Sequence, residues 1–209
     1  MNAKKIYALL IGKKNSKGYP GKNVMKINGI PSCEYGFQAA KRLGIKNIFV
    51  STDCPVIEKI GKTFSAQHIK RPEYLATPDS LTEDVLVHAY NEILKIKEKP
   101  EIIVLLFANN PAISIKLISK GIDKLTQDKT YDSAFSVSKY NMFSPARARK
   151  IVNEKISPFV SLDMIENVSS IRSSQGDVYF CDLSVQVIRS KVFENMKEGR
   201  IEEAFLYKI

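Results

Sequence analysis

The chain has 209 residues, of which 44% are hydrophobic and 26% are charged, and its formal net charge at pH 7 is +10. These values exclude a disordered chain and predict a single globular domain over residues 1–209. The positive charge favours an anionic ligand, but it is spread along the chain, which argues against nucleic acid or a membrane surface as the partner.

Short apolar runs alternate with amphipathic segments along most of the chain. The apolar runs predict strands at residues 6–11, 47–53, 101–108, 132–138 and 178–182. The amphipathic segments predict helices at residues 34–43, 55–64, 82–97, 113–125 and 184–196. The first three strands are apolar throughout, as in strands buried on both faces. The pattern therefore predicts an α/β fold with three layers, in which helices cover both faces of a mostly parallel sheet.

The segment 139–172 interrupts this alternation. It is polar and rich in serine, asparagine and arginine, and it contains no run that matches the strands before it. We interpret it as an excursion from the sheet, either a β-arm or a loop-rich lid.

The three cysteines, Cys33, Cys54 and Cys181, are odd in number and widely spaced. They indicate neither a disulfide framework nor a CxxC metal site, and a reducing cytoplasm suits them best. The longest apolar run, residues 102–108, is too short to cross a bilayer. The sequence therefore predicts a cytoplasmic protein that does not enter the membrane.

A basic, glycine-rich stretch follows the first predicted strand. Residues 9–23 read LLIGKKNSKGYPGKN. Glycines at the carboxyl end of a buried strand let backbone N–H groups approach an anion, and lysines there can neutralise phosphate oxygens. The spacing matches neither the P-loop nor the dinucleotide fingerprint. A solvated surface loop would have the same composition, so the position after the strand is what favours a phosphate site.

The stretch GKKNSKGYPGKN resembles the signature A-R-x-x-S-K-G-x-P-x-K-N of the sugar-acid cytidylyltransferases, the CMP-sialic acid synthetase family. Further segments match this family in the same order: VSTDCPVIEKIGKTF, RPEYLATPDSLTEDVLVHA, IIVLLFANNPAIS and QGDVYFCD. The resemblance implies a Rossmann-like nucleotidyltransferase fold. It also implies transfer of a cytidylyl group from CTP to a sialic acid-like sugar, with Mg²⁺ and release of pyrophosphate, for surface glycans such as lipopolysaccharide or capsule.

The resemblance also implies a set of nucleotide-binding residues. They are Gly12, Lys13, Asn15, Ser16, Lys17, Gly18, Lys22, Asn23, Arg71 and Thr82. Lys13, Lys17 and Lys22 are the catalytic candidates, because nucleotidyl transfer depends on positioning and on neutralising phosphate charge. Lys22 and Asn23 are expected nearest the α-phosphate. From the residues alone, a surface ion pair is the favoured interpretation of Arg71, and an N-cap of its helix is the favoured interpretation of Thr82.

The acceptor side is assigned in the same way. The family match gives Asn109, Asn110, Arg147, Arg172 and Tyr179 as sugar-binding candidates. The planar guanidinium of arginine suits the carboxylate of a sugar acid. Family members dimerise through an arm that corresponds to residues 139–172, so the resemblance predicts a homodimer whose ligands are CTP and an acidic sugar.

The sequence departs from the family pattern in three places. Lys13 stands where the family has arginine, which keeps the charge but loses the bidentate guanidinium. Asn109 and Asn110 stand where the family has a Thr-Ser pair, in a turn that faces the sugar in the family, so a related nonulosonic or keto-sugar acid is an alternative acceptor. The closely spaced aspartates that hold magnesium in the family are not found, and the metal ligands stay unassigned. Another base, a sugar phosphate acceptor, or a catalytically impaired nucleotide-binding homologue are the remaining alternatives.

Overall fold

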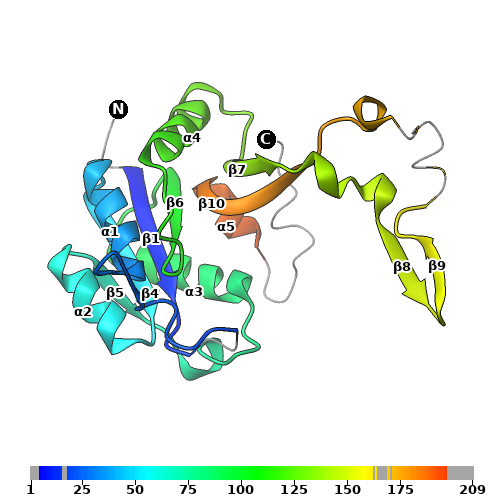
Figure 1. Ribbon diagram of the computed structural model, residues 1–209. Helices are drawn as coiled ribbons and strands as arrows, with labels where there is room; N and C mark the ends of the chain where they lie inside the picture. Colours follow the sequence, from blue (N-terminus) through cyan, green and yellow to red (C-terminus); the bar gives the residue numbers. More distant parts are fainter. Residues whose placement is uncertain (1–4, 16–17, 162, 164–168, 170, 197–209) are drawn as a thin grey trace. The chain divides into compact units, whose positions relative to one another are not determined.

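The computed structural model describes residues 5–15, 18–161, 163, 169 and 171–196 (Figure 1). The strands are β1 Ile6–Gly12, β2 Lys26–Ile27, β3 Ile30–Pro31, β4 Asn47–Thr52, β5 Gln67–Lys70, β6 Ile102–Phe107, β7 Ser133–Lys139, β8 Arg149–Val152, β9 Lys155–Pro158 and β10 Tyr179–Arg189. The helices are α1 Ser32–Arg42, α2 Pro55–Thr63, α3 Thr82–Ile96, α4 Ile115–Gln127 and α5 Ser190–Asn195. By its internal contacts the chain divides into two compact units, residues 136–183 and the rest.

The larger unit is built on a six-stranded sheet in the order β5-β4-β1-β6-β10-β7. Strands β5, β4, β1 and β6 are parallel, and β10 runs antiparallel to β6. In register, Leu9 of β1 lies opposite Phe49 of β4 and Leu105 of β6. These central strands are buried on both faces, as their continuous apolar sequences predict.

Two hydrophobic clusters fill the space between this sheet and its helices. Side chains of successive residues point to opposite faces of a strand, so Ala8 and Leu10 enter one cluster while Leu9 enters the other. The first cluster contains residues of α1, α2 and α4, and the second contains residues of α3 and α5. The predicted α/β fold, with helices on both faces of a mostly parallel sheet, is therefore confirmed (Figure 1).

The main error in the predicted elements concerns residues 184–196. A helix was expected there, but β10 continues through Arg189 and only Ser190–Asn195 is helical. Val185 and Val187 pack into one cluster while Ile188 packs into the other. This alternation of faces is a strand signal, and burial against β6 determines the outcome.

Smaller differences occur at the ends of helices. Helix α3 begins at Thr82, so its N-cap is Leu81 and no side chain caps it. Helix α4 begins later than expected, after Ser114, whose hydroxyl accepts a hydrogen bond from the N–H of Leu117. The edge strand β5 and the short hairpin β2–β3 were not predicted.

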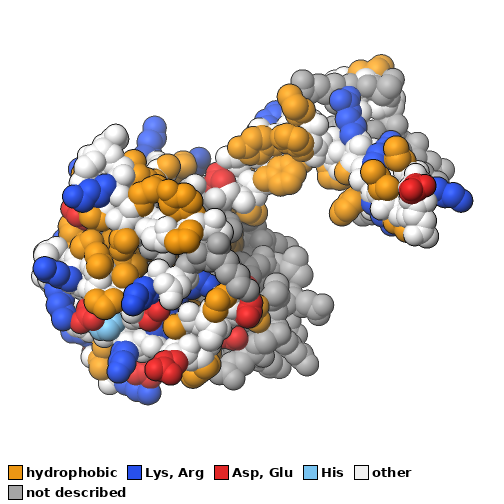
Figure 2. All heavy atoms as spheres, turned by 60° about the horizontal axis from the view of Figure 1, so that its bottom comes forward, with side chains coloured by type: hydrophobic (Ala, Val, Ile, Leu, Met, Phe, Trp, Pro, Cys, Tyr) orange, Lys and Arg blue, Asp and Glu red, His pale blue; other side chains and the backbone are white. Residues whose placement is uncertain are grey.

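The smaller unit spans residues 136–183 and contains the hairpin β8–β9, which is its main regular structure. Asn153 and Glu154 turn this hairpin with φ values of 50° and 64°. Figure 2 shows hydrophobic side chains exposed on this unit. In the hairpin, Ile151 and Ile156 are 72% and 70% exposed. None of the helices in the described part of the chain has the length and apolarity of a membrane span.

Candidate nucleotide-binding site

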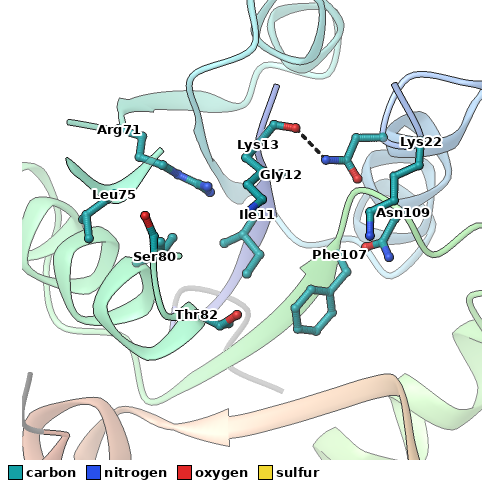
Figure 3. Close-up of a pocket in the computed structure, with 12 residues that line it drawn as sticks. Ile11, Gly12, Lys13, Lys22, Arg71, Leu75, Ser80, Thr82, Phe107 and Asn109 are labelled. Carbon is teal, nitrogen blue, oxygen red and sulfur yellow. Dashed lines mark hydrogen bonds between the residues drawn. The ribbon is translucent and has the colours of Figure 1, made fainter. Parts of the chain in front are cut away.

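A pocket of about 180 Å³ lies where β1 and β6 end (Figure 3). Its lining comes from the strand ends, the basic stretch, and the segment that leads into α3. The lining residues are Ile11, Gly12, Lys13, Lys22, Asn23, Arg71, Leu75, Ser80, Thr82, Val85, Phe107 and Asn109. In open parallel sheets, ligands bind outside the carboxyl ends of the strands, and this pocket has that position.

Gly12 is required by the close approach of β1 to the residue that follows β6. A Cβ atom at position 12 would lie 2.5 Å from the Cβ of Ala108 and 3.0 Å from Cδ1 of Ile57. The N–H of Ala108 also donates to the carbonyl of Ile11 at 2.9 Å, which holds the two chain segments together. Only glycine fits here without displacing the backbone at the base of the pocket.

The side chains that line the pocket make it cationic. Lys13, Lys22 and Arg71 contribute positive charge, while Ser80 and Thr82 add hydroxyl groups. None of the described residues lining the pocket carries a carboxylate. Elsewhere on the first unit, lysine and arginine side chains are scattered over the surface shown in Figure 2. The arrangement favours an anionic ligand in the pocket itself.

Arg71 is a buried cation whose side chain points into the pocket (Figure 3). It is 6% exposed, its Nη2 donates to the carbonyl of Ser51 at 2.9 Å, and its buried Nε has no hydrogen-bond partner. Burial lowers the pKa of Arg71, and the nearby charge of Asp53 raises it. Arginine nevertheless stays protonated in proteins. Its charge forms no ion pair with a described carboxylate, so it is free to bind a ligand.

The backbone of the basic stretch is held close to its start. The side-chain amide of Asn23 donates to the carbonyl of Lys13 at 2.7 Å, which is the dashed line in Figure 3. The next N–H, that of Lys14, donates to Oδ1 of Asp53 at 2.8 Å. Further along, Gly21 has a φ of 75°, which favours glycine, and the N–H of Val24 donates to its carbonyl.

A turn over residues 77–80 forms another part of the pocket wall. The hydroxyl groups of Thr77 and Ser80 are 2.8 Å apart, and Ser80 donates to the carbonyl of Tyr74 at 2.9 Å. The Nζ of Lys13 lies 3.4 Å from the carbonyls of Thr77 and Pro78. The first lysine of the basic stretch thus reaches across to this turn.

The structure brings together seven of the predicted nucleotide-site and sugar-site residues: Gly12, Lys13, Lys22, Asn23, Arg71, Thr82 and Asn109. Asn15 and Gly18 are exposed and do not line the pocket, and Ser16 and Lys17 lie outside the described residues. The roles assigned to these residues remain predictions.

The other acceptor candidates have different surroundings. Asn110 supports the turn after β6, since its amide donates to the carbonyl of Ser184 at 3.1 Å and its Oδ1 accepts from the N–H of Ala112. Arg147, Arg172 and Tyr179 belong to the smaller unit. Arg147 and Tyr179 are exposed there, and Arg172 begins a short 3₁₀ turn. Their part in sugar binding remains a prediction.

Sequence reasoning missed several residues of the pocket. They are Ile11, Leu75, Ser80, Val85 and Phe107. Ile11 and Phe107 lie at strand ends, which was a usable signal, because strand ends in a parallel sheet meet at one edge. Ser80 had no comparable signal, since its position depends on the fold of the turn.

The described residues do not assign ligands for Mg²⁺. Hard oxygen ligands, carboxylates above all, bind this ion. No cluster of three or more His, Cys, Asp or Glu side chains with metal-binding geometry occurs among the residues the structure describes. Asp177 pairs with Lys139 at 2.6 Å, and this lowers its pKa; Asp182 accepts from Ser138 at 2.8 Å. A magnesium requirement remains a prediction.

The chain is an α/β protein with a cationic pocket at the carboxyl ends of its parallel strands. The sequence matches the model of the family described as Cytidylyltransferase over residues 11–155. The chain belongs to this cytidylyltransferase family.

Individual proteins are similar to the chain at low identity. N-acylneuraminate cytidylyltransferase B of Danio rerio is 27% identical over 120 residues, which is 57% of this chain and 27% of that protein. The 3-deoxy-manno-octulosonate cytidylyltransferase of Haemophilus ducreyi is 24% identical over 143 residues, which is 67% of this chain and 54% of that protein. The chain therefore matches only about a quarter to a half of the length of these relatives.

Solved structures share the fold. A CMP:2-keto-3-deoxy-manno-octonic acid synthetase complexed with CTP superimposes with a TM-score of 0.64 at 18% identity. The superposition covers 91% of this chain and 76% of that one. This likeness supports the Rossmann-like fold that the sequence predicted.

Proposed function

We propose that the chain binds CTP in the pocket described above and transfers its cytidylyl group to an acidic sugar. The observation that carries this proposal is a pocket with three cations and no described carboxylate, formed by a chain of the cytidylyltransferase family. In the reaction, a hydroxyl oxygen of the sugar forms a bond to the α-phosphorus of CTP. The bond from this phosphorus to the β-phosphate oxygen breaks, pyrophosphate leaves, and the hydroxyl proton passes to solvent.

The cations would act on the charge of the triphosphate. Lys13 and Lys22 come from the basic stretch and Arg71 from the end of β5, so positive groups face the pocket from two sides (Figure 3). Preorganised cations of this kind stabilise the charge that develops as pyrophosphate leaves. Lys22 is the candidate for the contact nearest the α-phosphate, with Asn23 beside it. Lys17, the third catalytic candidate, lies outside the described residues.

The acceptor is proposed to be a sialic acid-like or related keto-sugar acid. This rests on the relatives, whose names specify an N-acylneuraminate and a 3-deoxy-manno-octulosonate. Asn109 lines the pocket in a turn that departs from the family pattern, which favours an acceptor with different hydroxyl groups. Arg147 and Arg172 are the proposed partners of the sugar carboxylate.

We also propose a homodimer formed through the smaller unit. This unit exposes many large apolar side chains: Tyr140, Met142, Phe143, Ile151, Val152, Ile156, Phe159, Ile171, Tyr179 and Phe180. Exposed apolar surface of this extent marks interaction sites in soluble proteins. Sedimentation equilibrium at micromolar protein tests the proposal, and a mass of 23.5 kDa alone would refute the dimer.

A nucleotide panel tests the proposed function. Isothermal calorimetry with CTP, UTP, GTP and ATP should show selective binding of CTP. Pyrophosphate release is then measured with N-acylneuraminate and 3-deoxy-manno-octulosonate, each with and without Mg²⁺. Selective binding of another nucleotide, or no binding at all, would refute the proposal. CTP binding without pyrophosphate release on any sugar acid would instead favour a nucleotide-binding homologue that does not catalyse the transfer. None of the described lining residues carries a carboxylate that could hold a metal ion, and this observation favours that alternative.

A substitution links the activity to the pocket. Lys22→Ala should lower turnover by roughly 10²- to 10³-fold, the effect of removing one preorganised donor to a developing negative charge. Lys62→Ala is the matched control, because Lys62 forms a surface pair with Glu58 at 2.6 Å and does not line the pocket. Equal activities of the two variants would contradict the assignment of Lys22.

A further inference from the structure

One peptide group of the basic stretch is held at both of its polar atoms. The peptide that joins Lys13 to Lys14 accepts a hydrogen bond at its C=O from Asn23, at 2.7 Å. Its N–H donates to Oδ1 of Asp53, at 2.8 Å. The peptide is planar, so two bonds on opposite sides fix the orientation of the whole group. They therefore set the direction in which the chain leaves β1.

Both side chains that hold this peptide are anchored in the sheet and its helices. Asn23 is 7% exposed, and its own carbonyl accepts from the N–H of Cys33 at the start of α1, at 3.0 Å. Asp53 directly follows β4, whose last residue, Thr52, lies opposite Gly12 in the parallel register. The carboxylate thus stands beside the point where β1 gives way to the basic stretch.

The course of the chain after Lys13 depends on this peptide. The torsion angles on either side of it, ψ of Lys13 and φ of Lys14, set the direction of the residues that follow Lys13, and Asn23, which bonds the peptide, is the residue after Lys22. Lys13 lines the pocket, and the chain must return to it at Lys22. A rotated peptide would lose its bond to Asn23 and redirect the backbone between Lys13 and Lys22 relative to Arg71, which is held independently through the carbonyl of Ser51.

We propose that Asp53 is a positioning residue for the nucleotide site, which acts by fixing the Lys13–Lys14 peptide through its side-chain oxygen. The inference rests on the proposed binding of CTP in this pocket. Asp53 does not line the pocket, so it acts through the backbone of the basic stretch, which it holds at the N–H of Lys14. It acts as a hydrogen-bond acceptor, and a neutral acceptor of the same shape can replace it.

The carboxylate also has a charge effect that must be separated from its acceptor role. Its negative charge raises the pKa of Arg71, against the larger effect of burial. Asp53→Asn removes the charge and keeps an oxygen that accepts from the Lys14 N–H. Asp53→Ala removes both. The comparison of these two variants therefore assigns the effect to the hydrogen bond or to the charge.

The test measures CTP affinity by calorimetry for the wild type and both variants. Asp53→Ala should weaken CTP binding roughly 3- to 10-fold, as expected for the loss of one ordinary hydrogen bond, and Asp53→Asn should stay within about twofold of the wild type. Asp128→Ala is the matched control, because Asp128 likewise accepts from a loop N–H, that of Thr130, at 2.9 Å, and does not line the pocket. It should leave CTP affinity unchanged.

Hydrogen exchange provides a readout that does not depend on activity. The amide of Lys14 should exchange faster in Asp53→Ala than in the wild type, and Asp53→Asn should restore its protection. Equal losses of affinity in both Asp53 variants would overturn the proposal in favour of the charge effect. Wild-type CTP affinity in Asp53→Ala would overturn the proposal outright. If Asp53→Ala does not fold, the Asp53→Asn variant decides: weakened CTP binding with a normal exchange rate of the Lys14 amide would also overturn the proposal. Failure of the wild type to bind CTP would refute the proposed function instead.

Discussion

Substitution of Gly12 by alanine tests the close packing at the base of the pocket. The added Cβ would lie 2.5 Å from the Cβ of Ala108, about 1 Å closer than carbon atoms ordinarily approach. Its second neighbour, Cδ1 of Ile57 at 3.0 Å, is the end of a side chain and can move. Overpacking of this kind costs about 1–3 kcal/mol. Gly12→Ala should therefore destabilise the protein by that amount.

Removal of the opposing methyl group should relieve the clash. Ala108→Gly alone should cost about 1.5 kcal/mol, from one lost buried carbon and the flexibility of glycine. In the double variant the two Cβ atoms no longer meet, so the combined loss should fall short of the sum of the single losses by at least about 1 kcal/mol.

Urea denaturation followed by far-UV circular dichroism measures these losses. Gly18→Ala is the control, because a Cβ there would meet no atom within 4 Å, and it should change the stability by less than about 0.5 kcal/mol. Additive losses in the double variant would show that the contact between positions 12 and 108 does not limit the packing, and the reasoning would be refuted.

Three further outcomes are expected. Arg71→Met should weaken CTP binding roughly 10- to 100-fold in calorimetry, and unchanged affinity would contradict this. The variant should also lose about 1 kcal/mol of urea stability, because it removes the buried hydrogen bond from Arg71 to the carbonyl of Ser51. Burial lowers the pKa of His88, so below about pH 6.5 the unfolded chain binds a proton that the folded chain does not. The free energy of unfolding should therefore fall as the pH drops from about 7.5 to about 5.5. His88→Gln should reduce this fall, and an identical fall in the variant would exclude His88 as its source. Burial, with a smaller effect of Cys54, raises the pKa of Cys33 to about 12. Cys33 and Cys54 are buried and Cys181 is exposed, so iodoacetamide at about pH 8 should alkylate Cys181 in the folded protein and the other two only after unfolding. Mass spectrometry of the alkylated protein checks this.

The central strands could be predicted because their apolar runs have one physical explanation. IYALLI and IIVLLF are continuous, and burial on both faces of a parallel sheet is the arrangement that removes all of their side chains from water. The clear helices, α3 among them, follow from apolar residues at helical spacing. The family resemblance, which rests on the basic stretch, was confirmed by the family match over residues 11–155.

The course of β10 was harder to predict, because its residues pair with a strand far away in the sequence. Gln186 lies opposite Leu105, and Arg189 lies opposite Ile102. Buried Arg189 also donates from Nε to the carbonyl of Tyr131 at 2.7 Å, which anchors the end of the strand. Neither contact has a local signature, and the apolar residues of 184–196 suit a short helix equally well.

Residues of the pocket were predicted only where they lie in the segments that resemble the cytidylyltransferase family. Lys13, Lys22 and Arg71 were expected, and they line one pocket. The contribution of Asp53 could not be predicted from spacing, because it depends on the parallel register that brings the end of β4 beside the end of β1. The same holds for Ser80, whose position follows from hydrogen bonds within its own turn.

The strand order has a consequence for synthesis of the protein on the ribosome. Every lining residue of the pocket lies between Ile11 and Asn109, so translation completes that region within the first 109 of the 209 residues. The neighbour that β6 requires on its other side, β10, is translated only with residues 179–189. An unpaired sheet edge favours aggregation. Until β10 is translated, the β6 edge has no partner, so we expect the chain to be most prone to aggregation during this interval.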